Sequence, residues 1–67
     1  MVLNMNNRKA EEIARIFLSQ NYSVLGIVKS KIANHTWTVE VLVSSFDKNA
    51  IKKIKIDDTT GSIIKIE

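Results

Sequence analysis

Hydrophobic residues in the first third of the chain recur with the spacing of one helical face. The positions that follow the i, i+3, i+4, i+7 pattern are Ala10, Ile13, Ala14 and Phe17. An asparagine at position 6 or 7 can cap the start, and Asn21 can end the helix in a left-handed conformation. The pattern therefore predicts a helix over residues 7–21.

After this segment the period of the pattern changes from 3.6 to 2. In HTWTVEVLVSSF, one parity holds Trp37, Val39, Val41 and Val43. In the preceding YSVLGIVKSKIAN, the apolar parity holds Val24, Val28 and Ile32. Such alternation is typical of strands with one buried face. We expect Trp37 to lie on the buried face and to close the core.

Three tight turns would keep the apolar faces of successive strands consistent. A turn at Asn34-His35 sets Ile32 beside Trp37, Val28 beside Val41, and Lys29 beside Glu40. A corner at Asp47-Lys48 sets Val41 beside Ile54, Val39 beside Ile56, and Glu40 beside Lys55. A loop Thr59-Thr60-Gly61 sets Ile56 beside Ile64 and Ile54 beside Ile66. The predicted fold is α+β: one N-terminal helix packed on a four-stranded antiparallel β-meander, in a single domain over residues 1–67.

The segment DDTTG invites a ligand-binding interpretation, but its spacing favours a turn. A calcium-binding EF-hand distributes its ligands over twelve residues, and a phosphate-binding P-loop needs a lysine and a longer loop. As a hairpin corner, the segment uses glycine for a positive φ. Asp57 and Asp58 are then placed to accept hydrogen bonds from turn amides.

Composition narrows the class of protein. The 67 residues include 45% hydrophobic and 25% charged residues, the balance of a globular protein. The absence of cysteine excludes disulfides and thiolate metal sites. The sequence contains no apolar run long enough for a signal peptide or a membrane span, so we expect a cytoplasmic protein with no membrane association. The net charge of +3 permits attraction to polyanions, although it also serves solubility.

The order of features resembles the PepSY domain family. The matching features are small residues on the buried helix face (Ala10, Ala14), a Trp-x-Val-x-Val strand (Trp37, Val39, Val41) and an ending of the form Ile-Asp-x-x-Thr-Gly-x-Ile-Ile (Ile56, Asp57, Thr60, Gly61, Ile63, Ile64). The resemblance implies a non-catalytic interaction module, often an inhibitory or propeptide-like segment of a larger protein.

The sequence offers few residues for catalysis. His35 is the single histidine and falls in a predicted turn, and Ser30 and Ser44 fall on strands with no acid beside them. We therefore predict no catalytic, metal-binding or cofactor-binding residues.

One face of the predicted sheet carries a basic patch. Its members are Lys29, Lys31, Lys53, Lys55 and Lys65, with Glu40 among them. Such a patch can follow a phosphate backbone, yet sheet faces that bind single-stranded nucleic acid usually include aromatic rings, and none falls here. A solvated lysine-rich face is the alternative interpretation.

At the other end of the same face the predicted register gathers an apolar corner. Its members are Leu25, Ile27, Leu42 and Ile51. If one helix covers the sheet, this corner stays in water and marks an interface, such as a homodimer. Alternatively, residues 1–6, with Val2, Leu3 and Met5, fold over it.

These two surfaces give two functional hypotheses. The first is a protein-interaction module resembling a stand-alone PepSY domain, which uses the apolar corner and tolerates loss of the lysines. The second is a small nucleic-acid-binding protein, which loses affinity with added salt and with each lysine removed.

Overall fold

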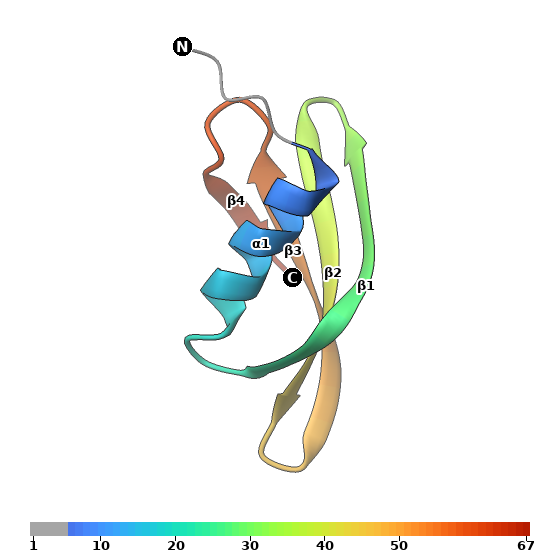
Figure 1. Cartoon of the computed structure of the whole chain (residues 1–67), viewed down its shortest axis with the longest axis vertical. Coiled ribbons are helices and arrows are strands. Elements are labelled where there is room, and N and C mark those ends of the chain that lie inside the picture. Colours follow the sequence, from blue (N-terminus) through green and yellow to red (C-terminus); the bar gives the residue numbers. More distant parts are fainter. Residues whose placement is uncertain (1–5) are drawn as a thin grey trace.

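The computed structural model describes residues 6–67 and contains one helix followed by four strands, joined as an antiparallel meander in the order β1-β2-β3-β4. The elements are α1 (Asn7–Leu18), β1 (Ser23–Ala33), β2 (Thr36–Ser45), β3 (Lys48–Asp57) and β4 (Ile63–Ile66). The helix lies across one face of the sheet, mainly on β1 and β2 (Figure 1). The predicted α+β fold is confirmed. No helix within the described residues has the length and apolar character that crossing a membrane requires.

The start of α1 agrees with the sequence pattern, and its end does not. Asn6 is the N-cap, and its side-chain oxygen accepts a hydrogen bond from the Lys9 amide at 2.8 Å. The helix ends at Leu18, with Ser19 as a right-handed C-cap (φ −65°). In the turn that follows the helix, the amides of Asn21 and Tyr22 both donate hydrogen bonds to the Leu18 carbonyl. The predicted left-handed end at Asn21 is therefore wrong, because a right-handed turn already satisfies that carbonyl.

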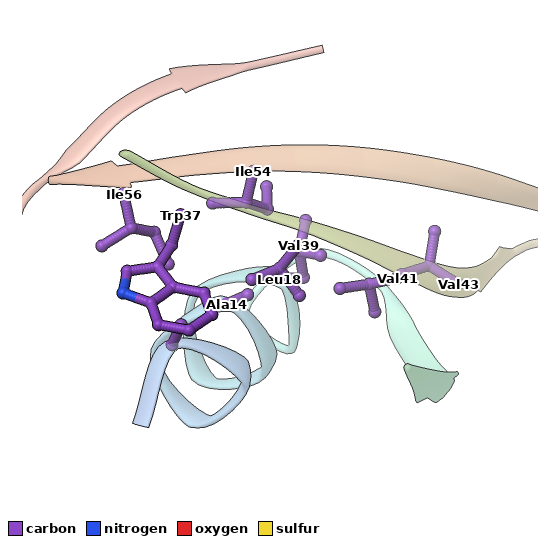
Figure 2. Packing of buried hydrophobic residues seen from close by; sticks show 9 residues of the cluster. Ala14, Leu18, Trp37, Val39, Val41, Val43, Ile54 and Ile56 are labelled. Atoms are coloured by element: carbon purple, nitrogen blue, oxygen red, sulfur yellow. The ribbon is translucent and has the colours of Figure 1, made fainter. Parts of the chain in front are cut away.

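The core lies between α1 and the helix-facing side of the sheet. Figure 2 shows Trp37, Val39 and Val41 pointing from β2 toward α1. The buried set comprises Ala10, Ala14, Leu18, Trp37, Val39, Val41, Val43, Ile54 and Ile56. The two alanines let the helix approach the sheet closely, and each fully buried valine or isoleucine contributes about 1.5–3 kcal/mol. The predicted buried position of Trp37 is confirmed.

The β1–β2 hairpin has the predicted turn but an irregular first strand. Asn34 and His35 have φ of 52° and 59°, which is the type I′ pattern. The predicted pairs Ile32–Trp37 and Lys29–Glu40 are confirmed.

In the part of β1 that precedes Lys29, two β-bulges shift the register, one at Leu25 and one at Val28. The residue opposite Val41 is consequently Ile27, so the predicted Val28–Val41 pair is wrong. Val28 is exposed instead of buried.

The β2–β3 hairpin is displaced by two residues from the prediction. Its turn residues are Phe46 and Asp47, since Ser45 pairs with Lys48. The observed pairs are Val39–Ile54, Glu40–Lys53 and Val41–Lys52, which replace the predicted partners Ile56, Lys55 and Ile54. A two-residue shift preserves the parity, so the same residues still face the core. The shift also places Ile56 opposite Trp37 under the helix.

The β3–β4 connection confirms the turn interpretation of DDTTG. Gly61 has φ 76°, and its amide donates to the Asp57 carbonyl at 2.9 Å. The Asp57 side chain accepts from the amides of Thr59 and Thr60, as predicted. Asp58 differs from the prediction, because its carboxylate accepts from the Trp37 indole at 2.7 Å.

The last strand keeps one of its two predicted pairs. Ile54 pairs with Ile66 as expected. Ile56 pairs with Ile63 instead of Ile64, because the register shifts between Lys55 and Ile56.

Candidate binding face

The sheet face opposite α1, here called the outer face, is left open by the helix (Figure 1). Residues directly opposite each other on antiparallel strands share a face, so the register defines its rows. The end of the sheet next to the β2–β3 turn is here called the tip end. Its two rows are Ser23–Ser44–Asn49 and Gly26–Leu42–Ile51. The next two rows are Lys29–Glu40–Lys53 and Lys31–Thr38–Lys55–Lys65. Charge is therefore segregated along the strands, with an uncharged tip end followed by lysines.

All five lysines predicted for the basic patch share the outer face. We call Lys29, Lys31, Lys53, Lys55 and Lys65 the lysine patch. Lys55 and Lys65 lie directly opposite each other, an arrangement of like charges that disfavours strand pairing. The stability of the sheet therefore does not explain why two lysines stand opposite each other here.

Glu67 partly offsets the positive charge of the patch. Its backbone pairs with Lys53, and Lys65 Nζ lies 3.0 Å from Glu67 Oε2. The hydrogen bond from Lys65 and its charge hold the pKa of the Glu67 carboxyl below its ordinary value of 4.5, with Lys55 acting in the same direction. Glu67 was not among the residues predicted from the sequence, although its position two residues after Lys65 on a strand is the signal of a shared face.

A hollow lies at the end of the lysine patch, near the β1–β2 turn. Its lining combines hydroxyl groups and two lysines with apolar side chains: Ala33, Asn34, Thr36, Thr38, Lys55, Ile64 and Lys65. The hollow therefore presents hydrogen-bond donors and positive charge together.

The apolar corner is smaller than predicted. Leu42 and Ile51 are direct neighbours across β2 and β3, and Ile51 is 52% exposed. Leu25 is the unpaired bulge residue next to Gly26 and is 54% exposed. Ile27 does not belong to this surface, because the bulges turn it toward the core. From here the apolar corner means Leu25, Leu42 and Ile51. The predicted alternative cover by Val2, Leu3 and Met5 lies outside the described residues.

Phe46 is an exposed residue that the sequence analysis missed. It occupies the β2–β3 turn, which lies at one end of the long axis (Figure 1), and its side chain is fully exposed at 101%. Its φ is 58°, a left-handed conformation that bulky residues rarely adopt. The sequence predicted the turn one residue later, at Asp47-Lys48, and that register places Phe46 on the strand and not in the turn.

The residues considered for catalysis in the sequence, His35, Ser30 and Ser44, do not come together in one site. His35 is in the exposed turn between β1 and β2. Ser30 faces the helix and donates to Glu11 Oε2 at 2.7 Å, whereas Ser44 lies on the outer face. Within residues 6–67, no three His, Asp or Glu side chains come together in a group that could hold a metal ion.

Comparisons with known proteins add no relative to this description. No family model matches the chain, and neither the curated proteins nor the solved structures contain a match to it.

Proposed function

We propose that this protein is a non-catalytic protein-interaction module that binds its partner through the apolar corner. The observation that carries the proposal is the Leu42–Ile51 pair, an apolar surface on a sheet face that the helix leaves open. The exposed Leu25 extends the same surface. Apolar side chains that cluster on the surface of a small protein are characteristic of binding sites.

The resemblance to PepSY domains supports the same proposal. It rests on the helix with Ala10 and Ala14 on its buried side and on the turn that ends in Gly61. Members of that family act as interaction modules without catalysis. A stand-alone PepSY-like module is therefore the form of the proposal, and its cytoplasmic location remains a prediction from the sequence.

A second candidate function is nucleic-acid binding through the lysine patch. The specific observation is that five lysines share one face, with Lys55 and Lys65 side by side. Lysine contacts to phosphates would give an affinity that depends steeply on salt. Against this candidate, Trp37 points into the core and Tyr22 lies under the Lys52 ammonium at 5.5 Å, so neither ring is on the outer face.

The test uses a photo-crosslinking amino acid at position 51 in the cells that produce the protein. We expect a discrete protein adduct that disappears when Leu42→Lys is added. The matched control places the same crosslinker at Ile16, which is similarly exposed (58%) but lies on the helix. An adduct that also forms from position 16, or no protein adduct from position 51, would contradict the proposal.

A second experiment tests the alternative with purified protein. Amide shifts are followed by NMR during titration with mixed-sequence single-stranded DNA, double-stranded DNA and RNA, at low and near-physiological salt. Saturable shifts along residues 29–31 and 53–55 that weaken with salt would favour nucleic-acid binding. The absence of shifts with all three would eliminate it.

A further inference from the structure

Phe46 has two features that disfavour it for the folded chain alone. Its ring is fully exposed, so it gains nothing from burial. Its backbone is also in the left-handed region, at the first of two central turn residues, where glycine is the usual choice. Strained backbone of this kind is often associated with a functional site. An interface that buries the ring would supply the hydrophobic stabilisation that the folded chain alone does not give it.

The outer face offers an apolar surface next to this turn. From the turn to the Leu42–Ile51 pair, the outer face carries only the neutral residues Ser44 and Asn49. The helix-facing side of the same ribbon instead carries Lys48 and Lys52. An apolar partner of the Phe46 ring therefore fits the outer face and not the opposite one.

We propose that two copies of this chain pack through the tip ends of their outer faces, with Phe46 of each copy on the Leu42–Ile51 pair of the other. The inference rests on the proposed function and names its partner as a second copy. A two-fold axis through the Ser44–Asn49 pair has Phe46 two residues to one side and Leu42 two residues to the other. Each is about 7 Å from the axis, since a strand rises about 3.4 Å per residue. The operation therefore brings Phe46 over Leu42 of the second copy.

The placement of the lysines does not oppose this arrangement. Asp47, like Phe46, lies two residues from the axis, and the Glu40–Lys53 row lies four residues away on the other side. The axis consequently brings the turn of one copy over the Leu42–Ile51 row of the other, and the Glu40–Lys53 row stays two residues outside the overlap. The Lys31–Thr38–Lys55–Lys65 row remains outside the overlap, so the most basic row is not forced against another positive surface.

The size of the surface sets the strength of the dimer. The contact consists of Phe46, the apolar corner and the neutral row, which are far fewer than the roughly 20–30 residues per partner of a standard stable interface. We therefore expect a dimer that dissociates on dilution.

Sedimentation equilibrium of the purified 67-residue chain over a dilution series tests the proposal. We expect concentration-dependent dimers, and at least a tenfold weaker association constant for Phe46→Gly and for Ile51→Lys. Phe46→Gly is the sharper variant, because glycine suits the backbone at this turn and the fold should stay intact. Ile16→Lys on the helix is the matched control and should associate like the wild-type protein.

Two results would overturn the inference: a wild-type chain that is monomeric at every concentration, or Phe46→Gly chains that associate as strongly as wild type. A monomeric chain whose residue 51 crosslinks to a different protein in cells would refute the second copy and leave the interaction module intact. Nucleic-acid binding with no protein adduct would refute both.

Discussion

The indole of Trp37 links the core to the β3–β4 loop through one hydrogen bond. Its N–H donates to Asp58 Oδ1 at 2.7 Å, and the Asp58 amide donates to the His35 carbonyl at 2.9 Å. Asp58 thus fastens the loop to the neighbouring turn. The sequence predicted both the buried ring and the turn, but the bond between them depends on how β2 and β3 align.

Replacing Asp58 by alanine should lower the free energy of unfolding by about 1–2 kcal/mol, because the buried indole N–H loses a charged acceptor. Urea unfolding measures the loss, and the indole N–H resonance in NMR should move. Asp58→Asn, which retains an oxygen acceptor, should lose less. Equal losses for the two variants would show that the hydrogen bond contributes little.

Phe46→Gly should have the opposite effect on the monomer. Relief of the left-handed backbone outweighs the entropy of glycine, so the free energy of unfolding should rise by about 0.5–1 kcal/mol. Urea unfolding at a concentration where the chain is monomeric gives the value. Asp47→Gly is the control, because position 47 has no positive φ and should gain nothing. A lower stability for Phe46→Gly would mean that the ring contributes to the fold.

Among the elements, β1 separates what the sequence could predict from what it could not. Alternation in β2 identified the buried face correctly, because each of its inward positions holds an apolar residue. In β1, bulges at Leu25 and Val28 each add one residue, and neither needs a special side chain. The bulges move Ile27 to the core and Val28 to solvent. Periodicity cannot detect such insertions when both parities are apolar.

The β2–β3 turn illustrates a second limit. Asp47-Lys48 looked like a suitable corner, but the chain turns one residue earlier and tolerates a strained Phe46. Turn propensities cannot anticipate a residue held against its preference. The lysine patch survived this error because a two-residue shift keeps every lysine on its face.

Gly26 leaves room for a side chain on the outer face of β1. An added Cβ there would meet no atom within 4 Å, and the residue opposes Leu42 on the outer face. Gly26→Val should raise stability by up to about 1 kcal/mol, since valine favours strands and can contact Leu42. Thermal unfolding checks the change. A decrease would indicate that this bulge requires the freedom of glycine.

Glu67 gives a prediction for the β4 end of the sheet. Because hydrogen bonding from Lys65 lowers the pKa of this carboxyl, the pairing stabilises the fold above pH 4.5 and is lost as the pH falls through the lower folded value. An NMR titration of the Glu67 carboxyl should find a midpoint below 4.5. Lys65→Gln should return the midpoint toward 4.5, whereas the control Lys31→Gln should not. An unchanged midpoint in Lys65→Gln would assign the shift to other charges.

For the whole molecule, the outer face joins an uncharged tip end to a basic end that carries Lys31, Lys55 and Lys65. The elongated shape, 42 Å along its longest axis, lets the two ends act separately. A partner on one end need not exclude a ligand on the other.

Salt distinguishes these two ends, because their interactions respond to it in opposite directions. The dimer buries apolar groups while two basic molecules approach, so added sodium chloride should strengthen association by screening the net charge of +3 on each chain. Any binding of single-stranded DNA through the lysine patch should weaken over the same range. Sedimentation equilibrium follows the first effect and fluorescence anisotropy of labelled DNA the second. In Lys31→Gln/Lys55→Gln chains the dimer should persist with a smaller salt response, and any DNA binding should fall. Dimers that weaken with salt would instead place the lysines inside the contact between copies, contrary to an interface centred on Phe46.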